Sequence, residues 1–449
     1  MKKFWILFFG ISFLGLNAQK KWSLQECVDY AVEHNLQIIQ NNYNKQIQDL
    51  NLKIAKNQYL PGVSASLSNN GSFGQQRYIN VTQRNDNFTN SANVGADILL
   101  FNNGRLEKTV RKTEFEVEAA QYDTETITNN ISLQIAQQYL TILLNKEITK
   151  ISESALQNAE RQYNRAKITT DVGTTAKTIL AEAEAALARE RQNLKTAEIN
   201  TRRSLFDLAQ LLQLTDYQNF DVEDVPVMGN PEAPLYSAEN IISTAYGNQP
   251  QIKAAEARIR AAEAQTQITR TAFWPTITAN AGLGTSYFNT LVRGNVGVDP
   301  ETGQSITESG FFKQYTDNFG QQIGVSANIP IFNKGITRLQ VEQSKLNEEL
   351  AKNSFAQQKQ QVLQNVQKAQ FDAESNYEAF IAALETEKSS ELALDFAQKS
   401  YDAGRSTIYD LNVARNNYAN AQGSVAQAKY NYLFSMKLLN FYAGIPLSL

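Results

Sequence analysis

The residue types most used in catalysis and metal binding are scarce in this sequence. His34 is its only histidine and Cys27 its only cysteine, and seven positions separate them within one helical pattern. That spacing puts both side chains on a similar face of a helix. Two ligands do not make a zinc site, which takes at least three from the protein. We therefore expect core or surface roles for both residues, with no metal and no cofactor.

Motifs for covalent or phosphate chemistry are also missing from the sequence. The chain contains neither a phosphate-binding glycine loop nor a nucleophile elbow. Its carboxylates sit next to Lys and Arg in helical patterns, which is typical of solvated faces and ion pairs. The sequence therefore predicts a protein that is not an enzyme. A formal net charge of −3 argues against nucleic acid as a partner.

The first residues have the pattern of an export signal, which we predict at 1–18. Lys2 and Lys3 precede an apolar run at 4–16, and Ala18 is a small residue suited to cleavage. The alternative is a retained membrane anchor, but the run is shorter than the about 20 residues that cross a bilayer. One cysteine cannot form an internal disulfide in the exported chain. Its stability must therefore come from packing or assembly.

The strongest feature of the chain is an internal duplication. An offset of 214 positions aligns Pro61 with Pro275, and from about residue 87 an offset of 231 aligns Gly173 with Gly404. The offset grows by 17 residues at a polar, glycine-containing segment, as expected for an exposed loop.

The duplication sets the predicted boundaries of the chain. The offset change places one loop in each copy, at residues 74–90 and 289–318. A segment with three prolines, 221–234, is the predicted linker between the copies. We therefore predict two helix–strand–strand–helix repeats, at 23–220 and 235–449.

Each repeat contains two stretches in which apolar and polar residues alternate. The apolar positions are Val63, Ala65 and Leu67; Val94, Ala96, Ile98 and Leu100; Ile277, Ala279, Ala281 and Leu283; and Val325, Ala327, Ile329 and Ile331. Strands of about ten residues with one apolar face and aromatic ends are typical of membrane barrels. The alternative is a soluble sheet with one face on a core, but the sequence offers no globular core to cover it.

Helical patterns flank the strands in both repeats. The first runs from Leu24 to Gln58, and two very long ones follow Gly104 and Gly335. A helix of about 65 residues is about 100 Å long. Beyond the second glycine of each repeat the pattern becomes a heptad. In the second repeat one seam position is occupied by Leu411, Tyr418, Val425, Tyr432 and Leu439, and the position three residues later by Ala414, Ala421, Ala428, Ser435 and Tyr442. The first repeat begins in the same way, with Leu180, Leu187 and Leu194. Such seams predict coiled-coil packing.

Four strands cannot close a barrel, and an open sheet edge in lipid leaves backbone groups unpaired. At least eight strands are needed, so several chains must share one barrel. Two chains would give eight strands with an interior filled by side chains, and three would give twelve strands with an opening. The predicted fold class is therefore mixed α and membrane β. Long coiled-coil helices and four strands per chain contribute to a wall that several copies share.

The order of elements resembles the TolC family of outer-membrane efflux proteins. Both strand-to-helix turns read Phe-Asn-x-Gly, and a tip reads Tyr401-Asp402-Ala403-Gly404 with Asp410-Leu411 after it. The resemblance covers about 23–449. It implies a homotrimer in the outer membrane of a Gram-negative bacterium with a large periplasmic portion. In that assembly the long coiled-coil helices form an α-barrel, and the four strands of each chain contribute to a trimeric 12-stranded β-barrel.

The resemblance also implies a function and partners. The chain would be the outer-membrane channel subunit of a tripartite efflux or type I secretion system, a passive conduit for small molecules or polypeptides. Its partners would be outer-membrane lipid, a periplasmic adaptor, and an inner-membrane efflux pump or ABC exporter. The competing hypothesis is a non-channel periplasmic coiled-coil scaffold or adhesin.

Four groups of site residues follow from these patterns. Val172, Gly173 and Gly404 mark the hairpin tips, where glycine permits the positive φ of a tight reversal. The resemblance implies that the tips close the tunnel and meet the adaptor, and the candidates there are Asp171, Thr178, Tyr401, Asp402, Arg405 and Asp410. The expected pore-lining residues are Asp97 and Asn328, and the strand-to-helix turns are Asn102, Gly104, Asn333 and Gly335.

The tip departs from the family pattern at two places. The family's closing network joins a Tyr and an Arg at one tip to an Asp after the glycine of the other tip. Tyr401 matches, but Arg405 lies one position before the usual Arg place, which holds Ser406. The usual Asp place holds Ile179. Asp171 and Asp402 could substitute, and the alternative is that Arg405 and Asp171 are solvated turn residues.

Overall fold

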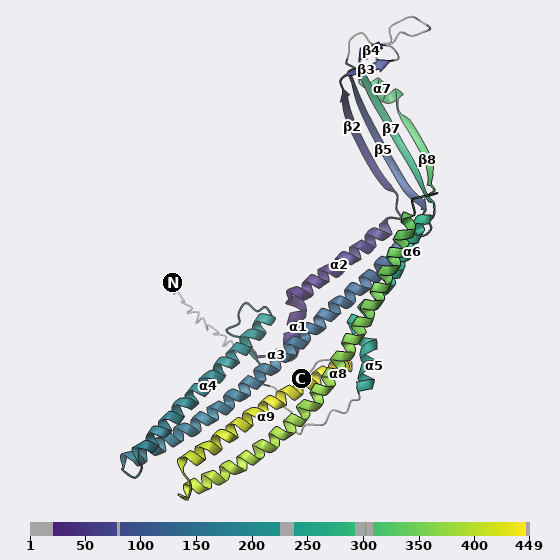
Figure 1. Cartoon of the computed structure of the whole chain (residues 1–449). Helices are drawn as coiled ribbons and strands as arrows, with labels where there is room; N and C mark the ends of the chain where they lie inside the picture. The colour runs from purple at the N-terminus through teal and green to yellow at the C-terminus, as the bar shows by residue number, and fades with distance from the viewer. Residues whose placement is uncertain (1–20, 79–80, 225–237, 292–300, 302–308, 446–449) are drawn as a thin grey trace, which may run out of the picture. The chain divides into compact units, whose positions relative to one another are not determined.

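The computed structural model (Figure 1) describes residues 21–78, 81–224, 238–291, 301 and 309–445. The predicted signal at 1–18 lies outside them, as does most of the predicted linker. In chain order the elements are β1 (Lys21–Trp22), α1 (Leu24–His34), α2 (Leu36–Asn57), β2 (Gly62–Ser72), β3 (Gln75–Tyr78), β4 (Val81–Arg84), β5 (Asn87–Phe101), α3 (Arg105–Asp171), α4 (Lys177–Leu211), β6 (Asp221–Val222), α5 (Ala238–Asn248), α6 (Pro250–Arg270), a 3-10 turn (Thr271–Phe273), β7 (Thr276–Thr290), α7 (Phe311–Asp317), β8 (Gly320–Asn328), α8 (Ile336–Asp402) and α9 (Ile408–Tyr442).

Internal contacts divide the chain into two units. The helical unit comprises residues 1–44, 121–254 and 356–449, and the strand unit comprises 45–120 and 255–355. Both units draw on both sequence repeats. The duplication therefore does not correspond to two separate compact bodies.

The strand unit is built on one antiparallel sheet. Its four long strands lie side by side in the order β2-β5-β7-β8 (Figure 1), so β2 and β8 are the edges. Cross-strand partners share a face. One face carries the row Val63, Ala96, Ala281 and Ile323, and the other carries the adjacent row Gly62, Asp97, Asn280 and Gly324. The predicted alternation is confirmed: one face is apolar and the other polar.

The apolar face remains exposed in this chain. Val63, Leu67, Ile323 and Val325 each leave more than two thirds of their surface uncovered. Burying an apolar side chain of this size contributes about 1.5–3 kcal/mol. The single chain therefore leaves a large part of its apolar surface unburied.

The structure corrects the predicted end of the last strand. The last strand was expected to reach Ile331, but β8 ends at Asn328, whose partner Thr276 is the first residue of β7. Pro275 and Pro330 explain the limit, because proline has no N–H to donate to a sheet.

The predicted loops also contain short elements. Within 74–90 the strands β3 and β4 form a hairpin, and β5 already begins at Asn87. Within 289–318 the helix α7 packs against β7, where the Gln314 side chain bonds both backbone groups of Phe288 at 2.9 Å. Sequence periodicity did not reveal these elements because each is seven residues or shorter.

The helix predicted over 24–58 is two helices that meet at Asn35. The Asn35 backbone is extended, and its side chain accepts a 2.9 Å hydrogen bond from the Gln37 N–H. Gln249 holds the same place in the second repeat, before Pro250 at the start of α6. A polar cap and a proline therefore interrupt corresponding helices.

The helical unit is held together by the predicted heptad seams. On α9, Leu411, Ala421, Tyr432, Ser435 and Leu439 are all buried. The long helices α3 and α8 are 67 residues each, about 100 Å at 1.5 Å per residue. The return helices α4 and α9 are 35 residues each. The buried seam residues therefore indicate coiled-coil pairing of α3 with α4 in the first hairpin and of α8 with α9 in the second.

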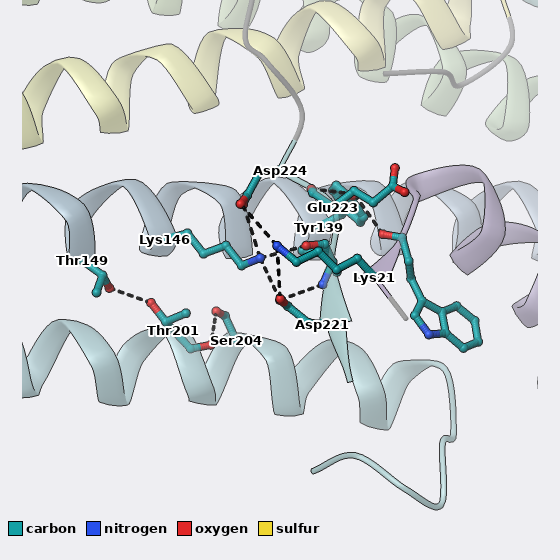
Figure 2. A network of polar contacts seen from close by, with 11 residues as sticks. Lys21, Tyr139, Lys146, Thr149, Thr201, Ser204, Asp221, Glu223 and Asp224 are labelled. Carbon is teal, nitrogen blue, oxygen red and sulfur yellow. Dashed lines mark hydrogen bonds and ion pairs between the residues drawn. The ribbon is translucent and has the colours of Figure 1, made fainter. Parts of the chain in front are cut away.

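A small polar clasp joins the start of the first repeat to the end of it (Figure 2). Strands β1 and β6 pair in parallel, so part of the segment predicted as linker is structured. The buried Tyr139 hydroxyl lies 3.1 Å from the Trp22 carbonyl oxygen and 3.0 Å from that of Glu223. Lys146 donates to the Val222 carbonyl oxygen at 2.8 Å and lies 2.7 Å from Asp221. Tyr139 and Lys146 both belong to α3.

The clasp gives a first prediction. Tyr139→Phe removes the buried hydroxyl and leaves the Glu223 carbonyl oxygen without this donor, which costs about 1–2 kcal/mol. We expect the Glu223 amide, which donates to the Trp22 carbonyl oxygen, to exchange its hydrogen about 5–30 times faster. Hydrogen–deuterium exchange on the purified protein measures this rate.

Tyr377→Phe on α8 is the matched control, because the structure gives that hydroxyl no hydrogen bond among the described residues. An unchanged Glu223 rate in Tyr139→Phe would show that the clasp does not depend on this hydroxyl.

Candidate functional site

The two hairpin tips have the same backbone geometry. Gly173 and Gly404 have φ of 80° and 70°, in the left-handed region that glycine adopts without strain. The N–H of each glycine bonds three residues back, to Thr170 and Tyr401, and the next N–H bonds five residues back. This is the Schellman motif, which satisfies the last carbonyl groups of a helix. Val172 is exposed beside the first tip.

The helices that leave the tips begin differently. Thr407 and Asp410 form a reciprocal capping box at the start of α9. Hydrogen bonds from the Thr407 hydroxyl and backbone lower the pKa of the Asp410 carboxyl. The corresponding cap of α4 is Ala176, which makes no side-chain hydrogen bond, and Ile179 replaces the acid. Asp410 therefore has a structural role that its first-repeat counterpart lacks.

An ion pair ties the two hairpins near their tips. Arg165 on α3 lies 3.3 Å from the Asp402 carboxylate on α8, and its guanidinium lies 5.6 Å from the centre of the Tyr401 ring. Hydrogen bonds from Gln398 and from Arg165 lower the pKa of Asp402. Asp402 is therefore charged at neutral pH, and the pair is lost only as the pH falls through that lowered pKa.

Arg415 on α9 completes the tie from the other side. It donates to Gln398 at 2.6 Å, and Gln398 donates to Asp402 at 2.9 Å. With its amide oxygen turned toward Arg415, Gln162 on α3 accepts from both guanidinium nitrogens at 3.0 Å. Burial and the neighbouring Arg161 lower the pKa of Arg415. Three helices are thus linked through one half-buried guanidinium.

A groove of about 1190 Å³ runs between the hairpins, lined by residues of α3, α4, α8 and α9. Tyr401 and Arg415 line it near the tips. Farther from the tips it is lined by Glu147 and Lys429, whose charged atoms are 3.3 Å apart. Ion pairs therefore lie at two levels of the groove.

The structure places the tip residues predicted from sequence in three situations. Tyr401 and Asp402 belong to the tie, and Asp410 caps α9. Arg405 and Asp171 are exposed and make no side-chain hydrogen bond or ion pair within the described part of this chain. Thr178 is also exposed. The closing network that the resemblance implies for Arg405 stays a prediction.

Sequence reasoning did not find Arg165, Gln162, Gln398 or Arg415. Arg415 carried a weak signal, because it lies four residues after the seam residue Leu411, where a charge flanks a packed face. The other three carried none, since their importance depends on which helices become neighbours.

The structure gives the positions of the remaining predicted residues, and the pore-lining role of Asp97 and Asn328 stays a prediction. The strand-to-helix turns have positive φ at Asn103 and Gly104, and at Lys334 and Gly335. The side chain of Asn102 accepts from the Arg105 N–H at 3.0 Å, and that of Asn333 contacts Thr337. Asp97 and Asn328 lie on the polar face of the sheet.

Cys27 and His34, both on α1, lie in different surroundings. Cys27 is fully buried, and burial raises the pKa of its thiol to about 12. His34 is exposed and stacks on Tyr30, with 4.1 Å between ring centres. Within the described ranges no three His, Cys, Asp or Glu side chains gather to hold a metal. No described helix has the length and apolar character needed to cross a bilayer.

Comparison with known proteins identifies relatives. Residues 29–213 and 241–444 match the family model described as outer membrane efflux protein. The chain is 25% identical to the outer membrane efflux protein BepC of Brucella suis biovar 1 (strain 1330), over 91% of this chain and 83% of that protein. It is 25% identical to outer membrane protein TolC of Escherichia coli (strain K12), over 73% of this chain and 63% of that protein.

A solved structure extends the likeness to the fold. The outer membrane protein VceC of Vibrio cholerae superposes with a TM-score of 0.76 at 17% identity, over 95% of this chain and 97% of that chain. This agrees with the predicted fold class of long α-barrel helices joined to β-barrel strands. The family match includes both repeats and favours an outer-membrane channel over a scaffold or adhesin. This chain belongs to the outer membrane efflux protein family.

Proposed function

We propose that three copies of this chain form one outer-membrane channel, a passive conduit from periplasm to exterior in a tripartite efflux or type I secretion system. A periplasmic adaptor would bind the helical hairpins near their tips. An inner-membrane efflux pump or ABC exporter would supply the energy. The chain itself would catalyse no reaction.

The observation that carries the proposal is the sheet. Its apolar face is uncovered, and β2 and β8 each have one edge with no strand beside it among the described residues. In lipid every unpaired backbone group costs several kcal/mol, so such edges must pair with other strands. Pairing β2 of one copy with β8 of the next removes both edges. Three copies give twelve strands, which leave room for a conduit.

The helices next to the edge strands support the same arrangement. On α2, which precedes β2, Ile47, Leu50 and Ile54 form an apolar stripe. On α8, which follows β8, a second stripe consists of Ile336, Leu339, Leu346 and Leu350. Each of these side chains is at least half exposed. Two different stripes that cover one another give a head-to-tail contact, which closes into a ring.

The tie between the hairpins gives the channel a closing element. Arg165, Asp402 and Arg415 hold α3, α8 and α9 together close to the tip glycines. Exposed ion pairs such as the one between Arg165 and Asp402 are individually weak. A few such contacts are weak enough for an adaptor to replace with contacts of its own. The tie would therefore hold the tips closed until the adaptor binds.

The stripes yield a prediction about assembly. Leu50→Glu with Ile54→Glu puts two charges into the contact between copies, where they cannot be solvated. We expect the detergent-solubilised protein to change from a trimer to smaller species. Size-exclusion chromatography with light scattering measures the mass.

Gln46→Glu with Lys53→Glu changes two exposed polar positions of the same helix and should leave the trimer intact. A trimer that survives the Leu50 and Ile54 changes would mean that the α2 stripe is not an interface.

The tie yields a prediction about conductance. Arg165→Ser with Arg415→Ser removes the contacts to Asp402, Gln398 and Gln162, so the tips are free to separate. We expect the single-channel conductance in planar lipid bilayers to rise at least about twofold, since a looser tip widens the narrowest part of the conduit.

Tyr401→Phe with Arg405→Ser tests the network that the family resemblance implies. If this pair raises the conductance while the Arg165 and Arg415 pair does not, the closing contacts lie between copies and not within one chain.

A further inference from the structure

The sheet carries a single charged side chain. Across the described strands β2, β5, β7 and β8 there is no Glu, Lys, Arg or His, and Asp97 on β5 is the one Asp. Its side chain is exposed on the polar face. No hydrogen bond or ion pair of its carboxylate occurs among the described residues. The charge of Asp97 is therefore not neutralised by a neighbour in its own chain.

Glycines opposite the large polar residues shape this face. Asp97 pairs across the strands with Gly62, Asn280 with Gly324, and Asn93 with Gly284. A methyl group added at Gly62 would lie 3.3 Å from the Asp97 carboxylate oxygen, and one at Gly324 would lie 3.1 Å from the Asn280 amide oxygen. These side chains therefore lie flat against the sheet, over the glycines.

Flat side chains have two consequences for a pore wall. They leave the space in front of the sheet open, because they do not extend away from it. They also hold the Asp97 carboxylate at one height along the strands. When several copies close a barrel, their Asp97 carboxylates lie at the same height and form a ring of charges.

We propose that Asp97 makes the outer section of the channel selective for cations, so that cationic solutes are the substrate class it favours. The proposal rests on the proposed function, because the polar face lines a conduit only when several copies close the barrel. Each copy then contributes one carboxylate to the same ring. Rings of Asp or Glu are a general means of attracting cations into a pore.

Asp97 lies near the helix end of the sheet, where the closest described cations along the chain are Lys56, which lies 3.5 Å from Glu114, and Arg105, Arg270 and Lys334. At the other end of the sheet, the described cations of the β3–β4 hairpin do not cancel this ring. Arg84 in the β3–β4 hairpin lies 2.6 Å from Asp86, which neutralises it. Arg77 lies beyond the end of the sheet at which Ser72 pairs with Asn87. Ser72 is ten residues along β2 from Gly62, the partner of Asp97. Ten strand residues span about 33 Å. That is several times the screening length of about 8 Å at physiological ionic strength.

The experiment measures ion selectivity of the full-length channel in planar lipid bilayers. A gradient of potassium chloride gives a reversal potential, and from it the permeability ratio of potassium to chloride. Asp97→Asn keeps the side-chain shape over Gly62 and removes only the charge. We expect this variant to lose at least about half of the wild-type cation preference, with conductance still measurable.

Two further variants test direction and position. Asn280→Asp adds a carboxylate next to Asp97 in the same row and should raise the cation preference. Asp317→Asn removes an exposed carboxylate from α7, outside the four strands, and should leave the preference unchanged.

The outcomes separate this proposal from the proposed function. Channels whose selectivity is the same in wild type and in Asp97→Asn would overturn the role of Asp97 and leave the channel function standing. A purified protein that forms no channels under any condition would overturn the channel function itself.

Discussion

Backbone groups at a sheet edge must find partners where no water is present, and the rest of this structure depends on that constraint. The four strands leave edges at β2 and β8 and an uncovered apolar face. Among the described helices, α7 contacts that face only near one end, where it meets Thr285 and Tyr287 of β7. The chain therefore carries a surface that is satisfied by lipid on one side and by further copies of itself at both edges. The exposed stripes on α2 and α8 extend the same requirement beyond the strands.

The two repeats share a backbone plan but differ where contacts between elements are made. Both tips end in the same Schellman motif at glycine, yet only the second is followed by a capping box. Asp402 corresponds to Asp171, but the position that corresponds to Arg165 is Phe396. Asp171 therefore has no corresponding arginine with which to form the equivalent ion pair. The duplication accounts for the shared architecture of the two repeats. Differences at single positions, such as Arg165 and Phe396, account for the tie being asymmetric.

Much of the fold could be predicted from the sequence. Alternation over Val94 to Leu100 specified a two-faced strand, because side chains on a strand point to opposite faces with period two. The equal spacing of Gly104–Gly173 and Gly335–Gly404 specified two long helices of equal length. Short elements escaped: the β3–β4 hairpin and α7 are too short for a period to appear. The helix break at Asn35 was missed because one polar cap does not disturb the apolar pattern around it.

The candidate site likewise contains features that the sequence predicts and features that depend on the tertiary structure. The sequence by itself determined the tips, the turns and the two faces of the sheet, since each depends on local geometry: glycine at positive φ, or the period of a strand or helix. Only the tertiary structure decided that Arg165 and Arg415 tie the hairpins and that Asp97 lies over Gly62. Those contacts join residues separated by up to 253 positions in the chain, as Gln162 and Arg415 are. They form only when packing brings particular helix faces and strand rows together, and no period in the sequence encodes which faces meet.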